Sequence, residues 1–249
     1  MEQIRLNKYI STKGVCSRRE ADRMIADGLV SVNGKIAQTG MKVTSEDTIL
    51  VNGKMITRDV PFILLAVNKP AGILCSDSDV QGKSIVSLLN YPERIYPVGR
   101  LDKESEGLVL MTNQGDLVNR ILRGANEHEK EYLVRLNKPV TDEFIEQMEN
   151  GVEILDTVTK PCQVKKVARC NVRMILTQGL NRQIRRMCEV LGYRVQYLKR
   201  IRIMNIHLKD LKVGEFRKIE DNELTEFLFL LKDSDPRPYK EIVKAENIE

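Results

Sequence analysis

The chain has 249 residues, of which 42% are hydrophobic and 30% are charged, and its formal net charge is +5. This length suffices for one large domain and one small domain. No apolar run approaches the ~18–20 residues that a membrane span requires, and the first residues lack a signal-peptide pattern. These properties predict a cytoplasmic protein without a membrane partner.

Cysteine and histidine usage argues against a metal site. The cysteines are odd in number, no two of them form a C-x-x-C pair, and the chain has two histidines. A structural zinc site needs four such ligands at short spacings. We therefore expect reduced thiols and no metal. The five cysteines are Cys16, Cys75, Cys162, Cys170 and Cys188.

Charge is unevenly distributed along the chain. Residues 1–58 carry a net charge of +4 and residues 159–205 a net charge of +11, whereas residues 59–158 carry −7 and residues 206–249 carry −3. Two basic segments in a chain of modest net charge predict a surface that faces a polyanion such as nucleic acid. The plainer alternative is a solvated charged face.

Residues 1–58 are predicted to form a small N-terminal α/β domain. Residues 4–12 follow the pattern of a short amphipathic helix. Ser17-Arg18-Arg19-Glu20 has the form of a capping box, which opens a second helix that stops at Gly28. The pairs Asn33-Gly34 and Asn52-Gly53 each lie between strand-forming residues, so each favours a type I′ hairpin turn.

Basic side chains gather on the two predicted helices of this domain. Lys8 belongs to the first helix, and Arg18, Arg19 and Arg23 belong to the second. Such a face suits phosphate contacts with structured RNA, where shape is read more than sequence. Docking to another protein is the alternative interpretation.

The larger domain is predicted to span residues 62–232, with a mobile tail at 233–249. Its elements lack strict βαβ alternation, which favours an α+β fold with a mixed, largely antiparallel sheet flanked by helices. The predicted strands are 62–67, 108–112, 131–136, 172–177 and 193–203, and the predicted helices are 85–89, 117–122, 141–151 and 182–191. Asp221 is predicted to N-cap a last helix that turns Leu224, Phe227, Leu228 and Leu231 inward.

The segment 98–108, Val-Gly-Arg-Leu-Asp-Lys-Glu-Ser-Glu-Gly-Leu, places an aspartate in a loop that leads into a buried strand. A rigid scaffold can aim a carboxylate from such a loop at a ligand. Asp102 is thus a candidate nucleophile, with Arg100 beside it as a cation for an anionic substrate. The alternative is a turn aspartate that bonds its own backbone.

Three ordered motifs resemble one known family, the RsuA-type rRNA pseudouridine synthases. They are the Gly99-Arg100-Leu101-Asp102 segment, the Lys130-Glu131-Tyr132 segment, and residues 179–187, Gly-Leu-Asn-Arg-Gln-Ile-Arg-Arg-Met. The first sixty residues resemble the ribosomal S4-type RNA-binding domain that many members carry. Within the family, residues 127–166 look most like the F-type enzymes, which act on large-subunit rRNA.

The resemblance implies a role for each matching residue. Asp102 would attack a uridine that is flipped out of its stack, Tyr132 would stack on the target base, and Arg185 would pair with the aspartate. Arg100 would fill the space that the flipped base leaves. Arg182 and Arg186 are expected to contact RNA phosphates. A strand-core role for Tyr132 and a phosphate contact for Arg185 are the alternatives.

Pseudouridine formation rearranges one nucleoside, so neither a cofactor nor a metal is expected, and the sequence has no Walker A or G-x-G-x-x-G loop. The expected partner is ribosomal RNA or transfer RNA, and the expected state is a monomer. A non-catalytic ribosome-assembly factor is the alternative from another class. An aspartate-based hydrolase is disfavoured, because no second carboxylate motif is evident.

Overall fold

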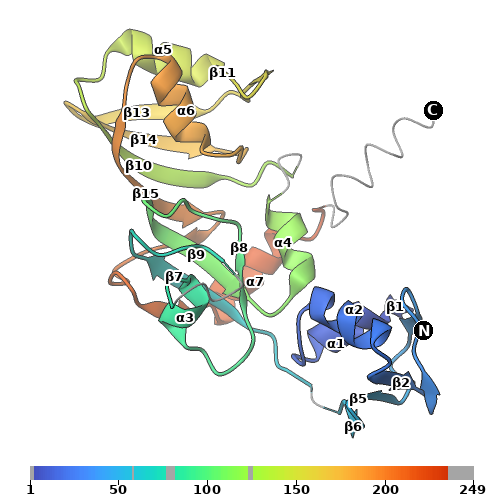
Figure 1. Ribbon diagram of the computed structural model, residues 1–249. Helices are drawn as coiled ribbons and strands as arrows, with labels where there is room; N and C mark the ends of the chain where they lie inside the picture. Colours follow the sequence, from blue (N-terminus) through green and yellow to red (C-terminus); the bar gives the residue numbers. More distant parts are fainter. Residues whose placement is uncertain (1–2, 58, 77–81, 123–125, 235–249) are drawn as a thin grey trace. The chain divides into compact units, whose positions relative to one another are not determined.

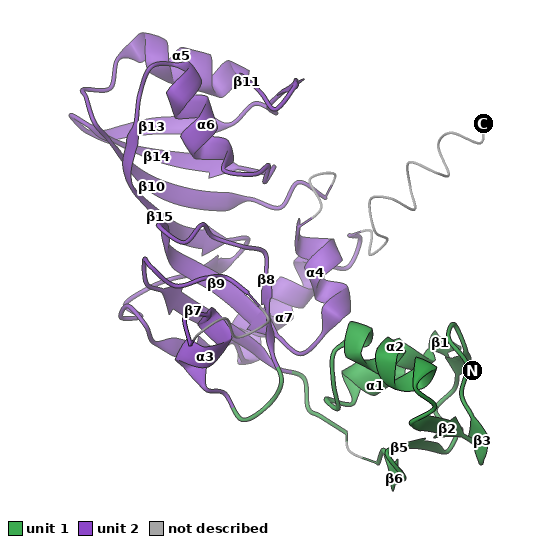
Figure 2. Ribbon diagram, viewed as in Figure 1, with its two compact units in different colours: residues 1–62, 92–94 green, residues 63–91, 95–249 purple. Residues whose placement is uncertain are grey.

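The computed structural model describes residues 3–57, 59–76, 82–122 and 126–234 (Figure 1). The chain divides into two compact units, the first comprising Met1–Phe62 with Pro92–Arg94 and the second comprising Ile63–Tyr91 with Ile95–Glu249 (Figure 2). The tail expected at 233–249 lies, apart from its first two residues, outside the described part of the chain.

Two helices and short strands form the first unit. Helices α1 (Leu6–Thr12) and α2 (Arg18–Ala26) pack through a shared apolar core. The Ser17 hydroxyl accepts a hydrogen bond from the backbone N–H of Glu20 at 3.0 Å, which confirms the predicted helix start. The strands are β1 (Ile4–Arg5), β2 (Val30–Val32), β3 (Lys35–Ile36), β4 (Lys42–Val43), β5 (Ile49–Val51) and β6 (Lys54–Met55).

Both predicted hairpin turns are present in this unit. The sheet order is β3-β2-β5-β6, and the residues of each turn have positive φ angles, 50° and 81° at Asn33-Gly34 and 50° and 73° at Asn52-Gly53. Positive φ at both central positions defines the type I′ turn. The two turns close the outer edges of a sheet whose inner strands supply core residues of this unit.

The second unit is built on a mixed sheet in the order β13-β14-β10-β15-β9-β7-β17. The pair β15–β9 is parallel and the other neighbours are antiparallel, as the predicted α+β class requires. The strands on this path are β7 (Leu64–Lys69), β9 (Glu106–Thr112), β10 (Lys130–Leu136), β13 (Gln163–Ala168), β14 (Asn171–Leu176), β15 (Val195–Ile203) and β17 (Phe216–Lys218). Strands β8 (Tyr96–Val98) and β16 (Ile206–His207) pair with β9 and β15, and β11 (Glu153–Ile154) pairs with β12 (Thr157–Val158).

Helices cover the two ends of this sheet separately. Helices α5 (Asp142–Asn150) and α6 (Gln183–Val190) lie beside β13, β14 and β10, whereas α3 (Ile85–Leu89), α4 (Gly115–Leu122) and α7 (Asp221–Leu230) lie beside β7, β8 and β9 (Figure 1). One apolar cluster joins β7 and β9 to α4 and α7, with Phe227 fully buried in it. The sheet therefore presents two helix-backed halves that meet at β15 and β9.

Several predicted boundaries were wrong. The strand predicted at 62–67 is β7, which runs on through Asn68 and Lys69 because Lys69 finds backbone acceptors in the interior. The N-cap of α7 is Glu220 rather than Asp221, and Leu228 is 43% exposed rather than inward. Strands β8, β13 and β17 were not predicted, because β8 is short and contains Pro97, and because β13 and β17 are rich in polar residues and lack an apolar pattern.

At Gly107 the strands β9 and β15 approach each other too closely to leave room for a side chain. The φ angle of Gly107 is 109°, and a Cβ built on it would lie 2.2 Å from the carbonyl oxygen of Arg200. A side chain therefore cannot fit between β9 and β15 here. Gly107 is the second residue of β9, so this packing also helps to fix the position at which the Asp102 loop joins the strand.

We expect Gly107→Ala to lower the free energy of unfolding by more than about 2 kcal/mol, because it combines a backbone clash with an unfavourable φ. Urea unfolding followed by circular dichroism measures this value. Gly179→Ala is the control, since a Cβ there meets nothing within 4 Å and should cost less than about 0.5 kcal/mol. Equal stability of the two variants would contradict the close packing.

Candidate active site

Asp102 lies in the loop between β8 and β9 and points a partly exposed carboxylate away from the core. Its side chain is 29% exposed, while the preceding Leu101 is buried and anchors the loop. The backbone N–H of Ser105 donates to the Asp102 carbonyl at 3.0 Å, which closes a turn around the residue. Arg100 is exposed on the same loop. The loop thus combines a fixed backbone with a reachable carboxylate.

Two arginines from the start of α6 approach this carboxylate. Arg185 Nε lies 3.5 Å from Asp102 Oδ2, and Arg182 Nη1 lies 3.7 Å from the same oxygen. These distances correspond to ion pairs rather than well-formed hydrogen bonds. The sequence-predicted partners Asp102 and Arg185 are therefore brought together, and Arg182, expected to face phosphates, also reaches Asp102 and pairs with Glu104 at 3.3 Å.

Arg185 is held in place by contacts on the other side of its guanidinium. It is 12% exposed, its Nη2 donates to the Ser105 hydroxyl at 3.0 Å, and its Nη1 lies 3.5 Å from the carbonyl of Val195. Its Nε is buried and has no hydrogen-bond partner among the described residues. Nε is the atom nearest Asp102, so a small movement of the carboxylate would complete a charge-assisted hydrogen bond there.

The local sequence explains why α6 begins at this point. Arg182 is its N-cap and has a left-handed backbone, with φ at 51°. The Gln183 side chain accepts a hydrogen bond from the Leu180 N–H at 2.9 Å, and Arg186 Nε donates to the Asn181 carbonyl at 3.1 Å. The motif 179–187 is thus folded by its own polar side chains, and its Arg182 and Arg185 are directed at the Asp102 loop.

Tyr132 lies on β10, in a row of cross-strand neighbours that runs over β15 to β9. It pairs with Arg200 of β15, and Arg200 pairs with Gly107 of β9. Tyr132 is buried, as is Arg200, whose Nε donates to the Leu108 carbonyl at 2.7 Å. The row links the strand that carries Tyr132 to the strand that follows Asp102.

Lys69 supports the Asp102 loop from the interior of the unit. The sequence analysis did not identify it as a site residue. Its side chain is fully buried, and its Nζ donates to the carbonyls of Ser105 at 2.8 Å and Pro70 at 2.7 Å, with Lys103 at 3.4 Å. The Gly72 N–H also donates to the Lys103 carbonyl at 2.7 Å. Burial lowers the pKa of Lys69. The sequence signal was the pair Asn68-Lys69, which directly follows the apolar run 62–67 and precedes a proline.

The remaining predicted RNA contacts are placed as follows. In the first unit, Arg18, Arg19 and Arg23 are exposed on α2, Arg23 is paired with Glu20 at 2.6 Å, and Lys8 is half-buried on α1. In the second unit, Arg186 is half-buried at the first turns of α6.

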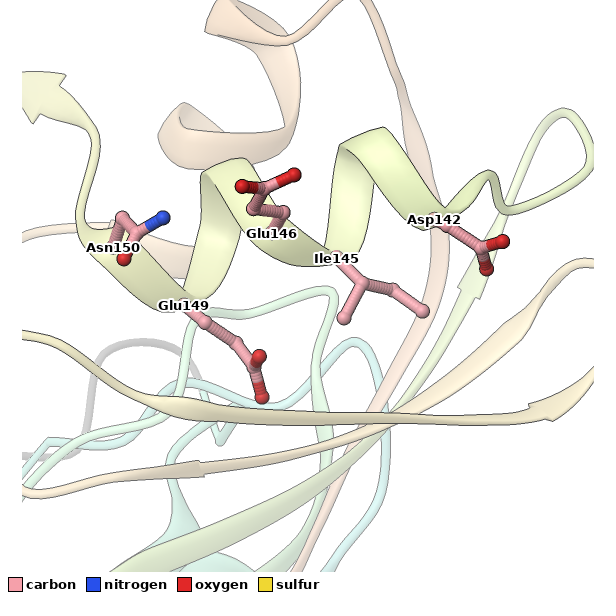
Figure 3. A pocket seen from close by; sticks show the side chains of 5 residues that line it. All are labelled: Asp142, Ile145, Glu146, Glu149 and Asn150. Carbon is pink, nitrogen blue, oxygen red and sulfur yellow. The ribbon is translucent and has the colours of Figure 1, made fainter.

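A surface hollow of about 490 Å³ lies elsewhere, along α5. It is lined by Asp142, Ile145, Glu146, Glu149 and Asn150, and Figure 3 shows these side chains on successive turns of the helix. Three carboxylates make this hollow unsuitable for a polyanion. Among the described residues, no group of three or more His, Cys, Asp or Glu side chains could hold a metal ion, and no helix is long and apolar enough to cross a membrane.

Lys130 precedes Tyr132 by two residues and gives a pH-dependent prediction. It is buried, with Nζ donating to the His128 carbonyl at 2.9 Å, and burial together with the nearby Arg200 lowers its pKa from 10.5 to about 8. The folded state therefore loses this proton at lower pH than the unfolded chain. The lysine's contribution to stability is least favourable below pH 8 and improves from there up to about pH 10.5.

Comparing wild type with Lys130→Met isolates this effect. We expect the free energy of unfolding of the wild type to gain on the order of 2 kcal/mol over the variant between pH 7.5 and pH 10. Urea denaturation at several pH values measures the difference, and Lys212→Met, at an exposed lysine, controls for the loss of one amino group. A pH-independent difference would show that Lys130 does not titrate in this range.

Comparison with known proteins agrees with this arrangement. Residues 63–190 match the family described as RNA pseudouridylate synthase, and residues 4–49 match the S4 domain. The chain is 53% identical over 232 residues to the dual-specificity RNA pseudouridine synthase RluF of Salmonella typhi, covering 92% of this chain and 80% of that protein. It is 35% identical to the ribosomal large subunit pseudouridine synthase B of Bacillus subtilis, covering 88% and 93%. A crystal structure of a pseudouridylate synthase matches with a TM-score of 0.66 at 30% identity, covering 91% and 99%.

Proposed function

The chain belongs to the RNA pseudouridylate synthase family, and we propose that it isomerises a specific uridine of large-subunit ribosomal RNA with Asp102 as the reacting carboxylate. The observation that supports this role best is the geometry around Asp102: an accessible carboxylate on a fixed loop, with Arg185 and Arg182 within 3.7 Å. RNA binding alone has no use for such a carboxylate.

The reaction conserves all atoms and electrons. The N1–C1′ bond of the uridine breaks, the base turns, C5 bonds to C1′, and the proton at C5 is lost while N1 gains one. Asp102 either adds to C1′ or promotes elimination to a glycal, and both routes need its ionised form. The nearby guanidiniums orient the carboxylate. We propose that Tyr132 stacks on the base and assists the proton transfer at C5.

Access to Asp102 requires that the uridine leave its stack, which costs a few kcal/mol. Arg100 is exposed two residues before Asp102, so its planar guanidinium is suited to occupy the vacated space. Arg182 and Arg186 would contact phosphates beside the target. In the first unit, Lys8, Arg18, Arg19 and Arg23 would contact other phosphates of the RNA.

The proposed substrate class, ribosomal RNA, is inferred from the names of the relatives. The Bacillus subtilis protein is named for the large ribosomal subunit, and the Salmonella typhi protein is named as dual-specificity. The same chemistry on transfer RNA is the second candidate, since a dual-specificity relative makes one further RNA class plausible. We propose that the protein acts in the cytoplasm as a monomer. A non-catalytic assembly factor is disfavoured by the presence of Asp102 with Arg185.

We expect Asp102→Asn to reduce pseudouridine formation below detection, because the amide keeps the size of the side chain but lacks the anion. RNA affinity should stay within a few-fold, since it depends on phosphate contacts elsewhere. Tritium release from 5-tritiated uridine in a large-subunit rRNA transcript measures turnover, and circular dichroism checks folding. Asp142→Asn, at an exposed acid on α5, is the control. Near wild-type turnover by Asp102→Asn would overturn the assignment.

The first unit gives a separate prediction. The triple variant Arg18→Gln, Arg19→Gln, Arg23→Gln should make the log–log dependence of RNA affinity on salt shallower by about 2 to 3, because each lost phosphate contact lowers the slope by about 0.7 to 0.9. The turnover number on bound RNA should remain within about two-fold of wild type. An unchanged slope would show that this face of α2 does not meet RNA, and the alternative of protein docking would then take precedence.

A further inference from the structure

Exposed cations gather at the end of the sheet where β10 stops and β15 starts, where the chain runs from β10 to α5 (Figure 1). We call Arg135, Lys138, Arg169 and Arg194 the distal basic cluster. All four are exposed, and they come from β10, from the loop after it, from the β13–β14 turn and from the segment before β15. None of them belongs to the candidate active site.

Backbone hydrogen bonds bring these segments together. The Asn137 N–H donates to the Arg194 carbonyl at 3.0 Å, and the Arg194 N–H donates to the Asn137 side chain at 2.7 Å. Three residues further on, the Val140 N–H donates to the Arg169 carbonyl at 2.9 Å. The loop that carries Lys138 is therefore fixed between Arg194 on one side and Arg169 on the other.

The cluster differs in its pairing from several other cations of the second unit. Arg173, Arg182, Arg185, Lys199 and Arg202 each form an ion pair with a carboxylate. Within the described part of the chain, no side chain of the distal basic cluster forms an ion pair, although Lys138 Nζ lies 4.1 Å above the Tyr193 ring. Neighbouring like charges without counter-charges repel one another, so an external anion would relieve this repulsion.

We propose that the distal basic cluster binds the phosphate backbone of the substrate RNA outside the segment that carries the target uridine, an inference that rests on the proposed function. Lys138 is six residues from Tyr132, which corresponds to roughly 20 Å of extended chain. With about 3.4 Å per nucleotide along a duplex as a guide, that is roughly six nucleotides. The contact is therefore available to a long RNA and out of reach of a minimal hairpin.

The surroundings indicate which way the RNA runs. On the α5 side, Asp142, Glu146 and Glu149 line the surface hollow and repel phosphate (Figure 3). On the other side, the β13–β14 turn and the start of β15 present Arg169 and Arg194. The backbone is thus guided across the end of the sheet and away from α5.

The test uses the triple variant Arg135→Gln, Arg169→Gln, Arg194→Gln in the full chain. The matched control removes three exposed lysines of the same unit, with Lys212→Gln, Lys218→Gln and Lys232→Gln. Two probes are used, a full-length unmodified transcript of large-subunit rRNA and a stem-loop of about 10 nucleotides, which extends less than six nucleotides to either side of the uridine that the wild type modifies. Affinity is measured against KCl concentration, and KM and kcat are measured on both probes.

With the long transcript, we expect the triple variant to lower the salt slope by about 2 to 3 and to raise KM at least about ten-fold, with kcat within two-fold. On the stem-loop it should match wild type. The control should match wild type on both probes. This pattern assigns the cluster to RNA beyond the target segment.

Two results would overturn the proposal, and a third would overturn the proposed function separately. If the triple variant and the control behave alike on the long transcript, the cluster does not face RNA, and a protein partner would be the better occupant. If the stem-loop is affected as strongly as the transcript, the contact lies beside the target uridine. If the wild type modifies no RNA, the proposed function fails by itself, and an unchanged salt slope for the long transcript then refutes the cluster independently.

Discussion

The ammonium group of Lys69 connects the end of a buried strand to the loop that carries Asp102. Its hydrogen bonds to the carbonyls of Pro70 and Ser105 replace water for a charge that is fully buried. The loop is then closed by the Asp102–Ser105 turn and leads into β9, where no side chain fits between Gly107 and Arg200. These contacts fix the backbone of the loop, while the side chain of Asp102 stays partly exposed.

The cations around the Asp102 loop of the second unit fall into two sets that differ in burial. Lys69, Lys130 and Arg200 are enclosed and bond backbone carbonyls. Arg182 and Arg185 are nearer the surface and face Asp102. The first set shapes the scaffold, and the second set pairs with carboxylates of the Asp102 loop. Sequence charge alone cannot separate these sets, because burial depends on which strands become neighbours in the sheet.

Much of the fold could be predicted from local signals. The Ser17 cap and the two Asn-Gly turns depend on residues close in sequence, and the structure confirms them. The family assignment from three motifs is also confirmed. Lys69 and Gly107 could not be identified as supports of the Asp102 loop, because their partners lie 36 and 93 residues away. The roles of Tyr132 and Arg100 remain predictions, since they concern a bound nucleotide.

The parallel pairing of β15 with β9 has a mechanical consequence. The registered pairs are Lys199 with Glu106 and Arg200 with Gly107, and they join the half of the sheet that carries Asp102 to the half that carries Arg185. A slip of one residue along this seam would displace the two relative to each other by about 3.3 Å, which is nearly as large as the 3.5 Å that separates them. Insertions at the outer edges of either half leave that seam in register. The outer edges can therefore vary in length during evolution while the distance between carboxylate and guanidinium stays the same.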